Sequence, residues 1–264
     1  MLNNNTINSL TRKEAELVAR MAYEKKDIVT SGDLDTYLPR DYPYRRKLVY
    51  SLKKKKLLIP VKNGVYIFVP LEAVSTGRRI SEFLIASLFF PRGGCYIGYS
   101  IMYNYYNFTN QQFQTVYVLN TRISRERTIA GLSFKFVKIP PERLYGLEEI
   151  DVNGKKAVIS DRERTLVDLM YFNEPVGGTN AAMDILMKTV QTGQCDVRKL
   201  IAYSVKFPII KTRKLIGFAL EKAGVNEKML IPLIKSVQKT SLISFTGSRK
   251  GQINEKWRVI VPVA

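Results

Sequence analysis

The sequence has 264 residues, 45% of them hydrophobic, and its 42 basic and 23 acidic residues give a formal net charge of +19. It contains no histidine, which excludes Ser-His and Cys-His nucleophile pairs and HExxH zinc sites. No apolar run approaches the roughly 20 residues of a membrane span, no signal peptide is evident, and the two cysteines fit no metal-ligand spacing, so we expect a cytoplasmic protein without metal or cofactor.

The first two helices are predicted from their start signals. Thr11 and Glu14 form a capping-box pattern that begins a helix of about four turns. The apolar pair Ile28-Val29 is expected to link it to a second, shorter helix. Thr30-Ser31 offers an N-cap for this second helix, and Pro39 ends it.

A third helix is predicted from residue 41 or 42, with an apolar face and a basic face that carries a tyrosine. A hairpin should follow, because Asn63-Gly64 lies between two short apolar strands. This order of elements is typical of a winged helix-turn-helix, which we assign to residues 1–72 and in which the third helix enters the major groove of DNA. The residues expected to contact DNA are Arg45, Arg46, Lys47, Tyr50, Lys53, Lys54, Lys62 and Asn63.

Three small helices and a hairpin can also form a protein-interaction domain. The placement of charge has to discriminate between this alternative and a DNA-binding domain. Between residues 45 and 56 seven basic residues occur without an acidic one. Residues 1–75, 76–195 and 196–264 carry net charges of +6, +3 and +10, so both ends are basic and the middle is nearly balanced. Charge concentrated in this way favours a polyanion, and double-stranded DNA is the expected partner.

Residues 78–264 are predicted to form a larger mixed α/β domain, so that the fold class of the chain is α+β. We expect a mixed sheet at about 95–175, a helical portion at about 178–240 and a final hairpin at about 241–262. Within these limits the expected helices are 79–90, 95–103, 160–170, 179–192, 196–206, 212–223 and 226–239, and the expected strands are 115–119, 133–138, 155–159, 242–245 and 257–261.

The basic C-terminal segment offers further candidate phosphate contacts. They are Lys211, Arg213 and Lys214 on a predicted helix, and Arg249 and Lys250 in a predicted loop. A solvated hairpin tip explains that loop equally well, and the segment could bind DNA, RNA or a protein.

A charged cluster begins the predicted helix at 160–170. Its members are Ser160, Asp161, Glu163, Arg164 and Asp168. We interpret it as a capped, salt-bridged helix start, with Ser160 as the cap. The alternative is a metal-dependent nuclease in which Asp161 and Glu163 act together with Asp151 and Lys155.

The order of segments resembles the AbiEi antitoxin family, the transcriptional-regulator half of abortive-infection toxin–antitoxin operons. The most specific match is the Asp-x-Glu-Arg-Thr-Leu-x-Asp-Leu stretch that begins at Asp161. The other matching pieces are Gly64-Val65-Tyr66, the stretches 96–102 and 112–118, Arg213 to Gly217, Leu220-Glu221 and Lys256-Trp257-Arg258. Ile101-Met102 replaces the Ala-Leu that the family tends to have.

The resemblance implies two functions and no enzymatic activity. The N-terminal domain would bind inverted repeats upstream of its own operon and repress it. The C-terminal domain would neutralise a toxin similar to nucleotidyltransferases, without needing a stable complex. A basic module that binds an acidic toxin directly is the remaining alternative.

Overall fold

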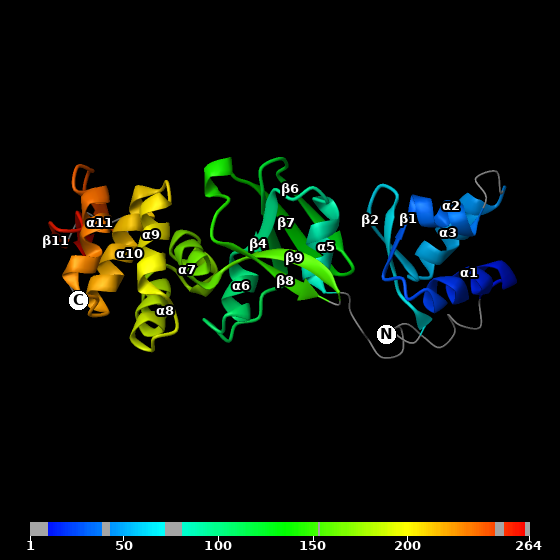
Figure 1. Cartoon of the computed structure of the whole chain (residues 1–264), viewed down its shortest axis with the longest axis horizontal. Coiled ribbons are helices and arrows are strands. Elements are labelled where there is room, and N and C mark those ends of the chain that lie inside the picture. The colour runs from blue at the N-terminus through cyan, green and yellow to red at the C-terminus, as the bar shows by residue number, and fades with distance from the viewer. Residues whose placement is uncertain (1–9, 39–42, 72–80, 153, 246–250, 262–264) are drawn as a thin grey trace. The chain divides into compact units, whose positions relative to one another are not determined.

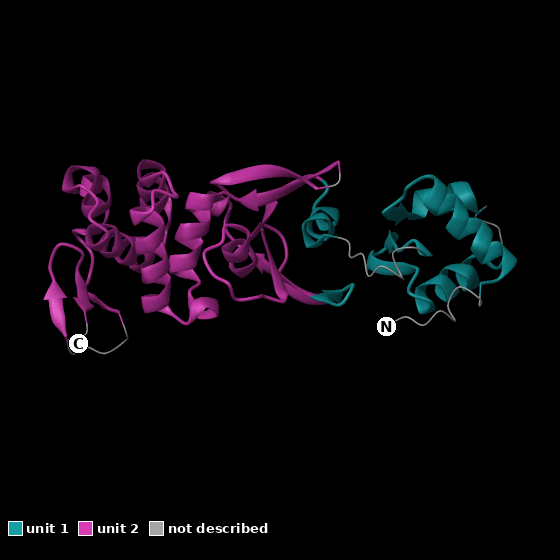
Figure 2. Cartoon of the chain, turned by 90° about the horizontal axis from the view of Figure 1, so that it is seen from below, with its two compact units in different colours: residues 1–91, 128–132 teal, residues 92–127, 133–264 magenta. Residues whose placement is uncertain are grey.

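The computed structural model describes residues 10–38, 43–71, 81–152, 154–245 and 251–261 (Figure 1). It is a mixed α/β structure that divides into two compact units (Figure 2). Unit 1 comprises residues 1–91 and 128–132, and unit 2 comprises residues 92–127 and 133–264. Unit 1 therefore includes the helix α5 (Glu82–Phe89), which the sequence analysis placed in the C-terminal domain.

Unit 1 begins with three helices and three short strands. The helices are α1 (Arg12–Tyr23), α2 (Ser31–Tyr37) and α3 (Arg45–Lys54), and the strands are β1 (Ile28–Thr30), β2 (Leu58–Lys62) and β3 (Val65–Phe68). The strands form an antiparallel sheet in the order β1-β3-β2. Thr11 and Thr30 cap α1 and α2, each in a complete capping box.

The apolar faces of these elements share one core. Leu17, Met21, Leu34, Leu48 and Leu52 meet there, and all five side chains are buried. Leu48 and Leu52 lie four residues apart on α3, so one face of that helix is buried and the opposite face remains exposed. The core thus fixes which residues of α3 face solvent.

A six-stranded mixed sheet in the order β6-β7-β5-β4-β9-β8 belongs to unit 2, except for residues 128–132 between and at the ends of β6 and β7. Its strands are β4 (Cys95–Gly98), β5 (Thr115–Asn120), β6 (Arg125–Ile129), β7 (Leu132–Lys138), β8 (Leu147–Val152) and β9 (Lys155–Ser160). The helix α6 (Ser100–Tyr105) follows β4, and α7 (Arg162–Tyr171) follows β9. Two short 3-10 helices lie at Pro141–Arg143 and Glu174–Val176.

The rest of unit 2 is a group of helices followed by a small sheet. The helices are α8 (Thr179–Gln191), α9 (Val197–Lys206), α10 (Ile210–Lys222) and α11 (Glu227–Val237), as expected. The strands are β10 (Ile243–Ser244), β11 (Gln252–Asn254) and β12 (Val259–Val261). No helix of the described residues is long and apolar enough to cross a membrane.

Several expectations about local structure were wrong. The link at Ile28-Val29 is the strand β1, because it pairs with β3. Residues 95–98 form a strand, and the helix α6 begins only at Ser100, after the N-cap Tyr99. The expected final hairpin is a three-stranded sheet in which β10 runs parallel to β12. The edge strands β6 and β8 were missed, since their charged residues obscure the strand pattern.

Candidate nucleic-acid interface

The exposed face of α3 carries most of the residues predicted to contact DNA. Arg46, Lys47, Tyr50, Lys53 and Lys54 are all exposed, and the Tyr50 side chain reaches 66% exposure. The Lys47 ammonium lies 5.6 Å from the centre of the Tyr44 ring. Within the described part of the chain, none of these four cations has a carboxylate partner. They are therefore available to an anionic ligand.

Two further cations of this region form ion pairs within unit 1, and for one of them the predicted contact to DNA is wrong. Arg45 was predicted to contact DNA, but its guanidinium pairs with Asp35 at 2.5 Å and its side chain is only 18% exposed. Its partner lies on α2, so Arg45 joins α3 to α2. Lys55 pairs with the buried Glu14 of α1 at 2.6 Å.

The Lys55–Glu14 pair is part of the cap of α1. Glu14 also accepts a hydrogen bond from the backbone N–H of Thr11 at 2.7 Å. Burial raises the pKa of the Glu14 carboxyl, but the hydrogen bonds from Lys55, Ser51 and Thr11 outweigh it and lower the pKa to about 2. Lys55 thus stabilises a buried carboxylate and is not part of the exposed basic face of α3.

The turn between β2 and β3 presents the remaining two predicted contacts. Lys62 is half-buried and Asn63 is exposed. Gly64 has a φ of +68°, which a residue with a side chain would adopt only with strain. Its carbonyl accepts the backbone N–H of Ser31 at 2.8 Å, so the hairpin turn is held against the start of α2.

The C-terminal candidates differ from one another. Lys211 is exposed, whereas Arg213 is half-buried and its Nε donates to the Phe207 carbonyl at 2.6 Å. Lys214 is fully buried, and its ammonium donates to the carbonyls of Ser241 and Arg258. Lys214 therefore holds the C-terminal strands and cannot be the phosphate contact that we predicted. Arg249 and Lys250 lie outside the described residues.

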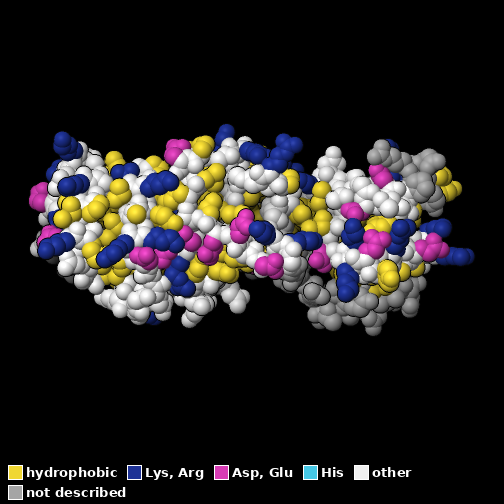
Figure 3. Space-filling view, viewed as in Figure 1, with side chains coloured by type: hydrophobic (Ala, Val, Ile, Leu, Met, Phe, Trp, Pro, Cys, Tyr) yellow, Lys and Arg dark blue, Asp and Glu magenta, His cyan; other side chains and the backbone are white. Residues whose placement is uncertain are grey.

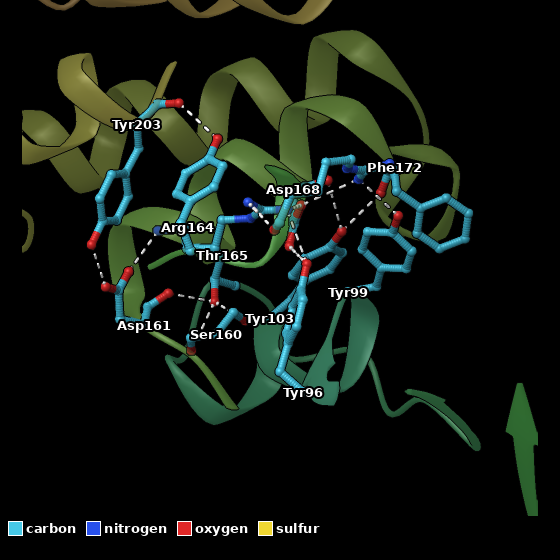
Figure 4. A network of polar contacts seen from close by, with 12 residues as sticks. Tyr96, Tyr99, Tyr103, Ser160, Asp161, Arg164, Thr165, Asp168, Phe172 and Tyr203 are labelled. Carbon is cyan, nitrogen blue, oxygen red and sulfur yellow. Dashed lines mark hydrogen bonds and ion pairs between the residues drawn. The ribbon is translucent and has the colours of Figure 1, made fainter. Parts of the chain in front are cut away.

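The charged cluster at the start of α7 is a buried network (Figure 4). Asp161, not Ser160, is the N-cap, and its Oδ1 accepts the Arg164 N–H at 2.8 Å. The Arg164 guanidinium and the Asp168 carboxylate are both fully buried and lie 3.0 Å apart. Arg164 also donates to the Tyr96 hydroxyl at 2.9 Å and to the Arg143 carbonyl at 3.0 Å.

Tyrosines from β4 and α6 complete this network. The Tyr103 hydroxyl donates to the Phe172 carbonyl at 2.9 Å, and the Tyr96 hydroxyl lies 3.4 Å from Asp168. Burial alone would lower the pKa of the Arg164 guanidinium, but the Asp168 carboxylate raises it. The Arg164 guanidinium thus keeps its charge in the interior. Tyr96, Tyr99, Tyr103 and Tyr106 are all buried, whereas Tyr105 is exposed.

One member of this network was not predicted from the sequence. The Arg143 guanidinium is buried, lies 3.9 Å from Asp168 and donates to the Tyr99 hydroxyl at 3.3 Å. It is 21 residues away from Arg164 in the sequence, and no local pattern marks it. Two arginines therefore share one buried carboxylate, and aromatic rings such as Phe207 cover both guanidiniums.

A second, more exposed part of the cluster joins α7 to α9. The Lys199 ammonium lies 3.1 Å from Asp161 and 3.0 Å from Glu163. Tyr203 donates to Asp161 at 3.0 Å, and Glu163 accepts the backbone N–H of Asp196 at 3.0 Å. These contacts agree with the interpretation of the cluster as a salt-bridged helix start.

In the part of the chain that the structure describes, the geometry does not assemble the metal site that the nuclease alternative requires. Asp161 and Glu163 are engaged by Lys199, and Asp151 accepts the backbone N–H of Gly154 at 3.0 Å. Among the described residues, no three carboxylate or thiol side chains lie in a group that could hold a metal ion. The arrangement does not bring the four proposed residues together around one ion.

On the face seen in Figure 3, basic side chains occur on the N-terminal unit, over the sheet and over the helices of unit 2, with acidic side chains between them. The charge of the protein is thus spread over both units, and its local pairing decides which cations are free. The face of α3 described above is one place where several free cations are adjacent.

Comparisons with known proteins show the fold alone. The chain is similar to the crystal structure of the RV2827C protein from Mycobacterium tuberculosis, with a TM-score of 0.69 and 14% sequence identity. The similarity covers 96% of this chain and 92% of that chain, so it extends over both units. No protein-family model and no curated protein matches the sequence.

Proposed function

We propose that residues 10–71 form a winged helix-turn-helix that binds double-stranded DNA, and that the chain is a transcriptional repressor and antitoxin. In this reading α2 and α3 are the helix-turn-helix, and α3 is the recognition helix. The turn at Lys62-Asn63 is the tip of the wing, and it contacts the DNA backbone.

The observation that carries the proposal is that some cations on and near α3 are paired with carboxylates and others are not. Arg45 and Lys55 are paired with carboxylates of the same unit, whereas the cations of the exposed face have none among the described residues. A cation that is already paired contributes little to binding a polyanion. The unpaired set lies on one face of a single helix, which suits phosphate and base contacts in a groove.

The test is fluorescence anisotropy of the full-length protein with DNA taken from upstream of its own coding sequence. In the variant R46Q/K53Q we expect the affinity to fall at least about tenfold, since each lost contact to DNA costs about 1–3 kcal/mol. The matched control is R12Q/K13Q, which removes the same charge from exposed positions of α1 that pair with Glu16. Its affinity should change less than about threefold.

Equal losses in the two double variants would show that only the total charge matters, and would overturn the assignment of α3. Circular dichroism of both variants verifies that they are folded. The variant R45Q makes a further distinction, because we expect it to lower thermal stability while the DNA affinity of the folded protein changes little.

The antitoxin role is supported by the resemblance to the AbiEi family described above. It predicts that co-expression rescues cells from a neighbouring gene whose product is similar to nucleotidyltransferases. R46Q/K53Q should keep this rescue while losing operator binding, because the two roles belong to different units. If R46Q/K53Q lost both the rescue and the operator binding, the assignment of the two roles to different units would be contradicted.

A further inference from the structure

A cavity of about 620 Å³ lies in unit 2. It is formed by the end of α6, the start of α7 and one face of α8 with its C-terminal turn. Its size falls within the range of about 300–1,000 Å³ that small-molecule sites occupy. The elements that surround it come from three separate segments, so the fold itself builds the cavity.

Two cations line this cavity. Arg162 is the first residue of α7, and its guanidinium lies 5.0 Å from the centre of the Tyr106 ring. The Tyr106 hydroxyl lies 2.6 Å from Glu148 and 2.9 Å from the Ser160 carbonyl, so this ring is fixed. A guanidinium stacked on a fixed ring is pre-oriented, and its planar N–H donors match the oxygens of a phosphate.

Lys188 lines the cavity from α8 and is exposed. Within the part of the chain that the structure describes, neither Lys188 nor Arg162 has a carboxylate partner. This distinguishes them from Lys199, Arg164 and Lys256 of the same unit, which are all paired with carboxylates. The two unpaired cations of the cavity favour an anion.

The other polar groups of the cavity favour a ligand that also carries hydroxyl groups. Asp184, one turn before Lys188 on α8, is the one carboxylate among the lining residues, and it too has no partner among the described residues. The Thr189 and Thr192 hydroxyls donate to the helix carbonyls of Ile185 and Lys188 at 2.8 Å. They therefore present acceptor lone pairs, as the carboxylate does.

From these observations we propose that the cavity binds a small phosphate monoester on a hydroxyl-bearing carrier, such as a nucleoside monophosphate or a sugar phosphate. Arg162 and Lys188 contact the phosphate, and Asp184 with the threonines accepts hydrogen bonds from the carrier. The site is independent of the proposed DNA interface, because it uses residues of unit 2 alone.

The experiment is isothermal titration calorimetry of the full-length protein with AMP, ribose 5-phosphate and inorganic phosphate at constant ionic strength. We expect ribose 5-phosphate or AMP to bind at least about tenfold more tightly than inorganic phosphate. Equal affinity of AMP and ribose 5-phosphate identifies the sugar phosphate as the recognised group, whereas tighter binding of AMP adds recognition of the base. No binding of any monoester at millimolar concentration would overturn the proposal.

Variants locate the site. R162Q/K188Q should weaken binding of the monoester at least about tenfold, whereas K228Q/K235Q, which removes two exposed cations from α11, should leave it unchanged. D184N should weaken ribose 5-phosphate but not inorganic phosphate, since it replaces one charged acceptor oxygen for hydroxyl groups by an NH2 donor and lowers repulsion of the anion. Equal effects of the two double variants would overturn the proposal. So would a D184N variant that binds both ligands as the wild type does.

Discussion

Arg164 is the main partner of the buried Asp168 carboxylate, and the loss of this partner should be costly. Arg164 and Asp168 are both fully buried, and the second arginine of the network lies farther from the carboxylate, at 3.9 Å. In R164M the Asp168 carboxylate keeps its desolvation cost and loses its main partner. We expect the free energy of unfolding to fall by roughly 3–5 kcal/mol, measured by urea denaturation. The control K156Q breaks an exposed pair with Glu149 and should change stability by less than about 1 kcal/mol.

The pKa of the Glu14 carboxyl lies well below the ordinary value of a glutamate. Its folded-state pKa is lowered from 4.5 to about 2. Because folding lowers this pKa, the stability that the Glu14 carboxylate contributes is complete above about pH 4.5 and is lost as the pH falls towards 2. A carbon-13 NMR titration of the carboxyl group should give a midpoint near pH 2. In K55Q the midpoint should rise towards 4.5, and an unchanged midpoint would show that Lys55 is not the cause.

At the scale of single elements, the glycine of α10 decides how the C-terminal sheet packs. A side chain at Gly217 would collide with the Trp257 ring, whose indole N–H donates to Glu221 at 2.6 Å. We expect G217A to destabilise unit 2 by roughly 1–3 kcal/mol and to shift the emission of Trp257, the one tryptophan of the chain, to longer wavelength.

The matched control for this prediction is G32A on α2. A Cβ at Gly32 would meet the Thr30 hydroxyl at an ordinary 3.6 Å, and the φ of Gly32 is not positive. Alanine lowers the entropy of the unfolded chain, so G32A should be neutral or stabilising by up to about 1 kcal/mol. A loss of stability in G32A as large as that in G217A would mean that helix glycines matter here for another reason.

The sequence predicts elements best where the signals are local. The capping box at Thr11 and the hairpin turn at Asn63-Gly64 were confirmed, and the helices from α8 to α11 lie close to their predicted ranges. The edge strand β8 was missed because three of its residues are acidic, and the parallel pairing of β10 with β12 joins segments that no turn connects.

The same limit applies to the candidate site. The amphipathic pattern of α3 correctly predicted which face is exposed, since Leu48 and Leu52 fix the opposite face in the core. The pattern of α3 could not predict that Arg45 pairs with Asp35. The pattern of α10 likewise could not predict that Lys214 is buried against carbonyls from a distant segment. Charge pairing depends on contacts between elements, and the sequence of one element does not contain them.

At the scale of the whole molecule, the 42 basic residues overstate the number of cations that a polyanion would meet. Several cations are neutralised internally, as Arg45, Lys55 and Arg164 are by carboxylates. The salt dependence of DNA binding measures the contacts that remain. A plot of log affinity against log salt should have a slope of about −0.9 for each phosphate neutralised.

For R46Q/K53Q we expect this slope to become less steep by about 2, because two phosphate contacts are removed. R12Q/K13Q should leave the slope within about one of the wild-type value. Both slopes are measured by anisotropy titrations between 50 and about 300 mM salt, the range over which such affinities change strongly. A slope unchanged by R46Q/K53Q would mean that these side chains do not contact phosphate.

The buried ammonium of Lys214 has a consequence for how the chain folds during synthesis. Its two acceptor carbonyls lie 27 and 44 residues farther along the sequence, and the Trp257 ring that covers Gly217 also comes later. When α10 leaves the ribosome, it therefore exposes an unsatisfied cation and an uncovered strip of helix backbone. The helices of unit 2 cannot reach their final packing until β10 and β12 have been translated, and a ribosome stalled between Lys214 and Arg258 would hold an incomplete unit open to chaperones and proteases.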